Sequence, residues 1–306
     1  MEEKDLPVAD SVFRLALGTL MGVSDPIEFG GDTDFVRTRW LADPSAAFVA
    51  ISNGKPVGSV FAAKWGSVAI VGPLTVHPKL WDKAIGTRLL EPTIALLDRW
   101  GSSHAGLHTV VHSAKHIRLY RKFGFWPRCL VEIMSKPVLE TRPDREMKLF
   151  STLDADKRAT VSRQCRELTE KIYDGLDLGR EIHAVATQGL GDTALLYDGD
   201  TLRGFAVCHW GEGTEAGTGR CYVKFGVVEK GPDAGPLFER LLDMCEVLTA
   251  ARGASQMVVG VNTARNEACR LVIEHGFHTE AVGVAMHRPY KEGYNRNDVY
   301  IIDDWR

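Results

Sequence analysis

One segment of the sequence combines a strand, a turn and the start of a helix in an order that suits phosphate binding. Residues 71–78 read VGPLTVHP, and the pattern of apolar residues predicts a long amphipathic helix over 85–100, with Gly86 in its first turn. The amides of a first helical turn have no partners within the helix and lie at the positive end of the helix dipole. They suit a phosphate or pyrophosphate, and Gly86 lets such a ligand approach the backbone closely.

A second segment of regularly spaced residues follows. Residues 113–125 read SAKHIRLYRKFGF, which predicts a short helix over 114–123 between two strands. Together the two segments resemble the GCN5-related N-acetyltransferase (GNAT) superfamily, whose patterns are V-x-P, then [QR]-x-x-G-x-[GA], then N-x-x-A-x-x-L-Y-x-x-x-G-F. Four residues of the last pattern are retained and two positions differ: Leu119, Tyr120, Gly124 and Phe125 are kept, with Ser113 at the Asn position and His116 at the Ala position.

The loop pattern is less complete than the helix pattern. Trp81 stands at the Gln/Arg position, Ala84 stands at the first Gly position, and Gly86 keeps the second. Ala84 can still donate its amide, because the phosphate cradle consists of backbone N–H groups. Its Cβ makes a conformation with positive φ costly. We therefore expect this loop to depart from the family in its shape or in its affinity for coenzyme A.

The resemblance implies an acetyltransferase that uses acetyl-coenzyme A as cosubstrate and needs no metal. In that family the pantetheine arm lies in a V-shaped opening between two strands and pairs with the first of them. The implied cofactor-binding residues are Leu74, Thr75, Val76, Lys83, Ala84, Ile85, Gly86, Thr87, Arg88 and Ser113. Amides of Leu74 to Val76 would stabilise the thioester oxygen as it gains negative charge.

Tyr120 is the implied catalytic residue. It corresponds to the residue that commonly protonates the departing thiolate in the family. A phenol with a pKa of about 10 transfers its proton to a thiolate, whose conjugate acid has a pKa of about 8.5, only if the site assists, so Tyr120 is expected to act mainly as a hydrogen-bond donor. The alternative is a core tyrosine packed under the sheet.

The general base stays open. An amine with a pKa of about 10 must lose a proton before it attacks, yet no Glu lies on the strands predicted over 56–64 and 67–76. His77, His112 and a chain of water molecules are the candidates. Histidines recur every four residues at 104, 108, 112 and 116, but the run crosses a loop, a strand and a helix start, so no metal site is predicted.

The elements that must position these residues occur in the same order twice. Helices over 10–20 and 33–41 precede strands over 46–52, 56–64 and 67–76, and strand, helix and strand then alternate, which predicts a mixed α/β sheet. Four landmarks recur at one offset of 152 residues: Val76 with Val228, Leu90 with Leu242, Gly101 with Gly253, and Gly124 with Gly276. We interpret the chain as two tandem copies of the GNAT-like fold rather than two unrelated α/β domains.

The predicted boundaries are a catalytic domain over 1–137, a polar linker over 138–145, and a degenerate GNAT-like domain with a C-terminal tail over 146–306. At the same offset Phe238 replaces Gly86, Pro236 replaces Ala84 and removes a donor amide, and Val272 replaces Tyr120. The second domain is therefore expected to buttress the first or to shape the acceptor pocket. A rival hypothesis places coenzyme A in this second domain.

Both ends of the chain raise a question about the sheet. Asp303 and Asp304 follow a short apolar strand over 299–302, and we favour solvated charges for them over a tail that joins a sheet or lines the acceptor cleft. The chain reaches its first helix by Asp10, which leaves little room for the family's first strand. That strand is either absent or replaced by another segment such as the tail.

Composition narrows the class of protein. The chain has 306 residues, 44% hydrophobic and 25% charged, with a net charge of −3, which excludes a disordered chain and gives no reason to expect nucleic acid or an anionic membrane as partner. No export signal and no apolar stretch long enough to span a bilayer are found, so we expect a cytoplasmic protein with six free cysteines. The expected partner is a small-molecule or peptide amine, with the protein a monomer or homodimer. The rival class is a non-catalytic acyl-coenzyme A binding or sensing protein.

Overall fold

The computed structural model describes residues 1–138 and 147–306, so the predicted linker lies outside the described residues except for Val138. The first half begins with two helices and a three-stranded meander, followed by alternating strands and helices. Its elements are α1 (Leu6–Met21), α2 (Phe35–Ala42), β1 (Ala47–Ser52), β2 (Lys55–Trp65), β3 (Val68–Val76), α3 (Ile85–Arg99), β4 (His104–Val110), α4 (Ala114–Arg121) and β5 (Trp126–Pro137).

The second half repeats this order. Its elements are β6 (Lys148–Leu149), α5 (Ala155–Glu170), α6 (Gly179–Gln188), β7 (Gly191–Asp198), β8 (Thr201–Gly211), β9 (Gly217–Val228), α7 (Ala234–Ala251), β10 (Gln256–Asn262), α8 (Asn266–Glu274), β11 (His278–Arg288) and β12 (Ile301–Ile302). Strand β6 ends at Leu149, and a 3-10 turn over Phe150–Thr152 follows it.

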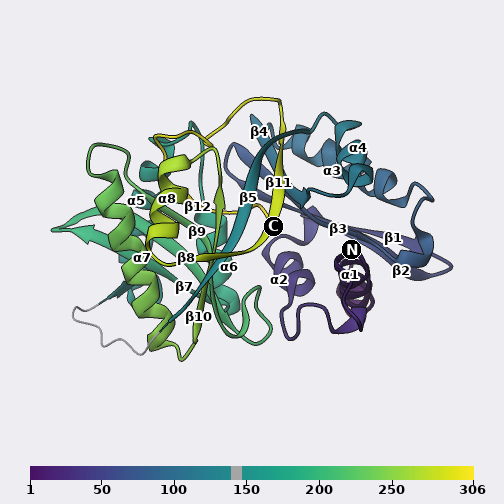
Figure 1. Ribbon diagram of the computed structural model, residues 1–306, viewed down its shortest axis with the longest axis horizontal. Coiled ribbons are helices and arrows are strands. Elements are labelled where there is room, and N and C mark those ends of the chain that lie inside the picture. The colour runs from purple at the N-terminus through teal and green to yellow at the C-terminus, as the bar shows by residue number, and fades with distance from the viewer. Residues whose placement is uncertain (139–146) are drawn as a thin grey trace.

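Both halves share one sheet, and each gives its last long strand to the other. The strand order is β1-β2-β3-β4-β11-β5-β10-β9-β8-β7-β6, so β11 lies between β4 and β5, and β5 lies between β11 and β10. Figure 1 shows β5 and β11 side by side where the two halves meet. The mixed α/β fold is thus confirmed, and the two repeats form one continuous structure.

The register of the exchanged strands confirms the repeat. Met257 pairs with Lys136, and the residues 152 positions away from each, Ala105 and Arg288, also pair. At the centre of the sheet Val131 pairs with Gly283, its own counterpart at that offset. The two halves are therefore related by an approximate twofold axis through this pair.

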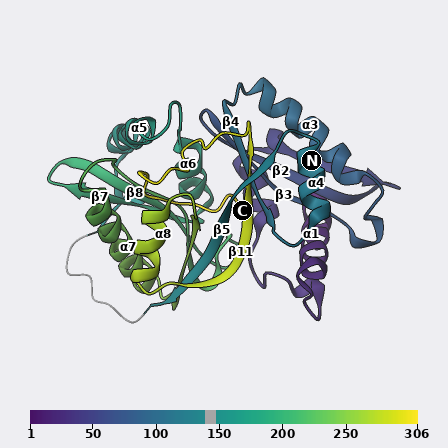
Figure 2. The same cartoon turned by 45° about the horizontal axis from the view of Figure 1, so that its top comes forward.

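The two faces of the sheet in the first half pack against different parts of the chain. Alternate residues of a strand point to opposite faces, and Ala69, Val71 and Leu107 pack in one core with Leu90 of α3 and Tyr120 of α4. Ile70 instead belongs to a core with residues of the second half. Figure 2 shows α3 and α4 gathered in one half and α5 to α8 in the other. The second half thus covers the face of β3 opposite to α3 and α4.

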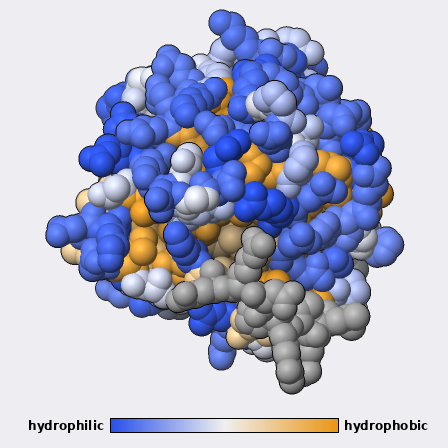
Figure 3. Space-filling view, turned by 90° about the vertical axis from the view of Figure 1, so that its left-hand side faces the viewer, coloured by the Kyte–Doolittle hydropathy of each residue, from blue (hydrophilic) through white to orange (hydrophobic). Residues whose placement is uncertain are grey.

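The edges and the surface complete the fold. Strand β1 ends the sheet, and the tail strand β12 pairs with β9 instead, so the idea that the tail replaces the family's first strand is wrong. The end of the molecule formed by the second half is mainly hydrophilic, with hydrophobic areas between charged side chains (Figure 3). Within residues 1–138 and 147–306, no helix combines the length and the apolar character needed to cross a membrane.

Candidate functional site: a backbone amide cradle beside two parting strands

The loop between β3 and α3 presents a row of backbone amides. The first hydrogen bond of α3 runs from Arg88 N to Ala84 O (3.1 Å), and within the described chain the amides of residues 82–87 donate to no protein acceptor. Ala84 caps the helix in the left-handed conformation with φ at 58°, and Asp82 has φ at 65°. The loop therefore keeps a glycine-like backbone path even where alanine replaces glycine. Six consecutive free amides at a helix N-terminus fit a pyrophosphate group.

Five residues of this segment, Asp82 and Ala84 to Thr87, line a cavity of about 340 Å³ between α1, β3, α3 and α4. Eight of the predicted site residues line this cavity: Leu74, Thr75, Val76, Ala84, Ile85, Gly86, Thr87 and Ser113. Lys83 and Arg88 are exposed beside it without lining it. The structure thus brings the two motifs to one place, and the binding role of each residue stays a prediction.

The cavity lies where β3 and β4 separate. These parallel strands pair only from Val68 with His104 to Ile70 with Gly106, although β3 continues to Val76 and β4 to Val110. Each strand presents peptide groups to both of its sides. The part of β3 beyond Ile70 is therefore paired with β2 on one side and unpaired on the side that faces β4. Peptide groups on that unpaired side are available to a ligand.

Trp81 and the basic side chains around the cavity explain how the loop tolerates its altered pattern. The Trp81 indole N–H donates to Val76 O (2.7 Å), which ties the loop to the end of β3. Lys115 lies over the Trp81 ring and pairs with Asp82 (2.6 Å). With Arg118 and Lys122 also in the lining, cationic side chains surround the cradle without a large basic surface.

Tyr120 lies in the core of the first half and does not line this cavity. It is buried among α3 and sheet residues, and no hydrogen-bond partner for its hydroxyl is found in the described chain. Burial raises the pKa of Tyr120 to about 12. The phenol is therefore neutral and is a weaker acid than a tyrosine in water, so its geometry and chemistry suit a hydrogen-bond donor. Ser113 caps α4 by accepting from His116 N (3.4 Å).

The histidines that sequence reasoning offered as bases occupy other roles. His77 accepts from Lys79 N (3.2 Å) at the end of β3, and His112 is exposed in the turn after β4. His108 is better placed: it lies on β4 two residues beyond its last pair with β3, and its ring occupies space that a Cβ on Gly283 would fill. Burial lowers the pKa of His108 to about 4, with Asp304 opposing this shift. The sequence marked His108 only as one of the regularly spaced histidines and not as a candidate base, because Gly283 and Asp304, which lie beside it, come from the second half.

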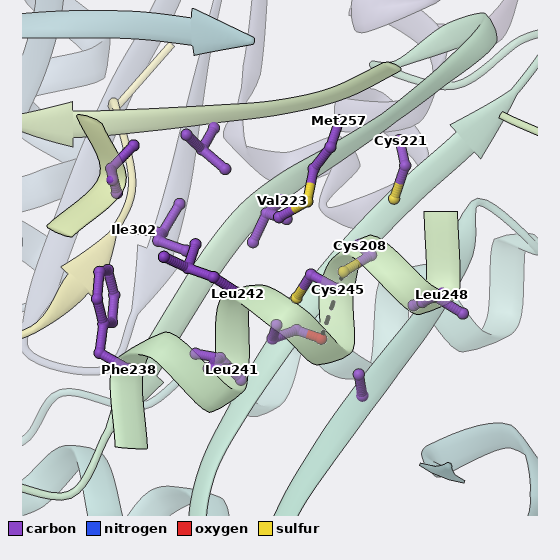
Figure 4. Close-up of a cluster of buried hydrophobic side chains, with 14 of the residues drawn as sticks. Cys208, Cys221, Val223, Phe238, Leu241, Leu242, Cys245, Leu248, Met257 and Ile302 are labelled. Atoms are coloured by element: carbon purple, nitrogen blue, oxygen red, sulfur yellow. Dashed lines mark hydrogen bonds between the residues drawn. The ribbon is translucent and has the colours of Figure 1, made fainter. Parts of the chain in front are cut away.

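The equivalent cleft of the second half is occupied by the chain itself. Strands β9 and β10 pair only as far as Val223 with Val259, in the register of β3 and β4, and β12 then pairs with β9 at Gly226 and Val227. Ile302 packs beside Phe238 and Leu242 of α7 (Figure 4). The segment 301–306, called the tail segment below, therefore takes the place that a cofactor arm would take in an open cleft.

The tail segment is buried along its length, so the preference for solvated charges at Asp303 and Asp304 was wrong. Asp303 pairs with Arg265 (2.6 Å), and Asp304 accepts from the Tyr222 hydroxyl (3.0 Å) and pairs with Arg306 (2.9 Å). Neither carboxylate is more than 2% exposed. Both are used by the protein's own cations, because burial of an unpaired carboxylate is costly.

Comparison with known proteins agrees with this geometry. A sequence model of the "Acetyltransferase (GNAT) family" matches residues 19–125. No curated protein matches the sequence. A Pyrococcus horikoshii protein assigned provisionally to the acetyltransferases superposes on 99% of this chain and 92% of its own, at 16% identity and a TM-score of 0.69.

Two further solved structures extend over both halves. A GCN5-related N-acetyltransferase from Sphaerobacter thermophilus covers 92% of each chain at 15% identity and a TM-score of 0.58. A tandem GNAT protein from the clavulanic acid biosynthesis pathway covers 94% of this chain and 95% of its own at 14% identity and a TM-score of 0.53. At these identities the likeness concerns the fold. The chain therefore has the tandem GNAT fold, and residues 19–125 of its first half match the model of the GNAT acetyltransferase family.

Proposed function

We propose that the first half is an N-acetyltransferase domain that moves an acetyl group from acetyl-coenzyme A to a primary amine by direct attack. The observation that carries the proposal is the row of free amides at residues 82–87, which opens onto the cavity beside the parted strands β3 and β4. The amides suit the pyrophosphate, and the open side of β3 suits the pantetheine arm. Members of the family transfer acyl groups from acyl-coenzyme A to amines, and the amide row and the parted strands of the first half support such a site there.

The residues then have distinct tasks. The amine nitrogen forms a bond to the acetyl carbon, the carbon–sulfur bond breaks, the sulfur leaves with the electron pair, and the ammonium proton passes to solvent. Amides of Leu74 to Val76 stabilise the carbonyl oxygen as charge develops on it. Tyr120 donates a hydrogen bond to the leaving sulfur. His108, neutral and on the opposite side of the parted strands from α4, accepts a hydrogen bond from the attacking amine.

The first half is the site of cofactor binding in this proposal, because the tail segment fills the equivalent cleft in the described part of the second half. Tyr300 lies over the Phe238 ring, and its hydroxyl is close to Gly235 in the first turn of α7. The amide of Ala234 is already bonded to Gly231 O (3.1 Å). These contacts argue against the rival hypothesis that coenzyme A binds in the second half.

A pair of matched substitutions tests the placement. Gly86 and Gly235 are each the second residue of the helix that follows the parting strand. Calorimetry with acetyl-coenzyme A should show an affinity at least about tenfold lower for Gly86→Asp, because the new carboxylate repels the phosphates, and no change for Gly235→Asp. Undiminished affinity in Gly86→Asp, or loss in Gly235→Asp, moves the site out of the first half.

A non-catalytic acyl-coenzyme A binding or sensing role is the second candidate, and the altered loop favours it, because Ala84 and Trp81 replace the usual residues. The two candidates differ in turnover. Release of free thiol from acetyl-coenzyme A should rise above its hydrolytic background for at least one member of a panel of small-molecule and peptide amines. Tight binding with no amine-dependent release supports the sensing role.

A further inference from the structure

The guanidinium of Arg39, on α2, joins the first half to the second. Its Nη1 donates to the carbonyl of Gly72 (2.7 Å), and its Nε and Nη2 donate to the two carboxylate oxygens of Glu215 (2.9 and 3.2 Å). Nη2 also donates to the carbonyl of Arg306 (2.5 Å). The planar group thus holds three different chain segments with fixed directions, which a lysine ammonium does not reproduce.

Gly72 stands at the point of β3 where the site opens. The pairing of β2 with β3 shifts register between Val60 with Leu74 and Ala62 with Val71, so a bulge lies at Gly72 and Pro73. The last pair with β4, Ile70 with Gly106, lies two residues earlier. A bulge leaves peptide groups outside the ladder. Arg39 supplies the partner for the Gly72 carbonyl and thereby fixes the peptide plane that precedes Leu74 to Val76.

Charged residues of the second half fix the position of the Arg39 guanidinium. Glu215 has no side-chain exposure and Arg39 has 10%, so the ion pair is shielded from water. Burial on its own would raise the pKa of Glu215, but Arg39 and then Lys224 outweigh it and keep that pKa below its ordinary value. Lys224 also pairs with Glu181 (2.7 Å), so this group of charges balances. Removal of Arg39 would leave Glu215 with Lys224 (2.9 Å) as a charged partner, whereas removal of Glu215 would take from Arg39 the carboxylate that it bonds, which confines Arg39 to this position.

Two segments of the second half deliver these partners. The loop that carries Glu215 is bonded to the segment before α2 through Asp34 N to Thr214 O (2.9 Å) and Gly213 N to Asp32 O (3.0 Å). The Arg306 carbonyl comes from the tail segment, the same segment that fills the second cleft. Both lie on the face of β3 opposite to α3, the side on which the proposed function places the attacking amine.

We propose that Arg39 is a positioning residue for acyl transfer, and that Glu215 and the Arg306 carbonyl set it, so that the second half acts on the reaction through Arg39. This inference rests on the proposed function. Arg39 holds the β3 bulge and does not itself contact the reacting atoms. A shift of about 1 Å at the reacting centre can cost on the order of a hundredfold in rate, so loss of this hold should appear in kcat.

Steady-state kinetics on full-length variants test the proposal. Arg39→Lys should lower kcat about 10- to 100-fold while the KM and the calorimetric affinity for acetyl-coenzyme A stay within about twofold, because the phosphate cradle is on another element. Arg39→Ala should regain part of its kcat in the presence of millimolar methylguanidinium. Arg37→Lys, an exposed neighbour on α2, is the matched control and should behave as wild type.

A second pair of measurements separates positioning from stability. Arg39→Lys and Arg39→Ala leave Glu215 partly unpaired, which can lower stability as well as kcat. The double variant Arg39→Met/Glu215→Met avoids this because it removes both charges, and replacement of a buried ion pair by apolar residues is often tolerated. It should be folded by circular dichroism and still show the lowered kcat. A folded variant at either position with wild-type kcat overturns the inference alone. A wild-type protein without amine-dependent thiol release overturns the proposed function and this inference together.

Discussion

Replacement of Tyr120 by phenylalanine tests how the leaving sulfur is stabilised. The pKa of Tyr120 is raised to about 12 by burial, whereas a thiol has an ordinary pKa of about 8.5. Full proton transfer from the phenol to the thiolate is uphill by about 3.5 pKa units, or about 5 kcal/mol. A hydrogen bond to a charged acceptor is worth about 1.5–3 kcal/mol, so donation without transfer predicts a fall in kcat of roughly 10- to 100-fold for Tyr120→Phe.

The assay is amine-dependent thiol release between pH 6 and 10, with calorimetry and urea unfolding alongside. We expect the affinity for acetyl-coenzyme A and the free energy of unfolding to change little, because no partner for the hydroxyl was found in the described chain. The alkaline side of the pH profile should be the same in both proteins. Tyr197→Phe, whose hydroxyl is bonded to Gln164 in the second half (3.4 Å), is the control and should keep wild-type kcat.

Two results would refute this reasoning. A kcat for Tyr120→Phe within twofold of wild type removes Tyr120 from the reaction and leaves it as a core residue. An alkaline loss of activity with an apparent pKa below 10, present in wild type and absent in Tyr120→Phe, shows that the phenol ionises in the working range. In that case the cause assigned to its pKa, burial without a nearby cation, is incorrect.

Two further substitutions test the loop and the buried charges. Ala84→Gly relieves a left-handed conformation that costs about 1–2 kcal/mol, and it adds about 0.4–1 kcal/mol of conformational entropy to the unfolded chain, so the free energy of unfolding in urea should rise by roughly 0.5–1 kcal/mol. The control Ala95→Gly, at an exposed position of α3, should lower the free energy of unfolding by about 1 kcal/mol. A decrease for both variants contradicts the left-handed conformation of Ala84. The second substitution concerns His209, whose pKa is lowered to about 4 by burial. Because the imidazole binds a proton more tightly in the unfolded chain than in the folded protein, about 3 kcal/mol of stability that is present above pH 6.5 is lost as the pH falls toward 4. His209→Leu should flatten that loss, and exposed His278→Gln should not; an equal slope in wild type and His209→Leu rules out His209 as its source.

Local patterns were enough to predict most elements of the fold. Glycines at Gly101, Gly124, Gly253 and Gly276 end helices with positive φ, so they mark the repeat in the structure as they do in the sequence. The loop motif and the helix motif meet in one cavity because a strand, a helix and a strand of fixed lengths leave few ways to connect. These are short-range constraints, and a single sequence displays them.

The partners of each strand and of each buried charge were not predictable in this way. Strand β5 has the same periodicity whether it pairs with a strand of its own half or with β10, 119 residues further along the chain at the pair of Pro137 with Gln256. Arg39 and Glu215 are 176 residues apart, and neither belongs to a motif. The tail looked like a charged end because Asp303, Asp304 and Arg306 are adjacent in sequence. Arg265, the cationic partner of Asp303, and Tyr222, which donates to Asp304, are 38 and 82 residues away.

The filled cleft of the second half explains why the two copies diverged as they did. Once β12 pairs with β9, Phe238 and Val272 face protein rather than a ligand and add to the core, whereas Pro236 is exposed in the first turn of α7. Ile302 and Phe238 are fully buried, and each contributes about 1.5–3 kcal/mol that an open cleft would forgo. The second half thus gains core stability from residues that would line an open cleft. The tail segment contributes both β12, which fills the cleft of the second half, and the Arg306 carbonyl, which accepts from Arg39. In the inference drawn above, the filled cleft of the second half and the positioning of β3 in the first half therefore depend on one stretch of chain.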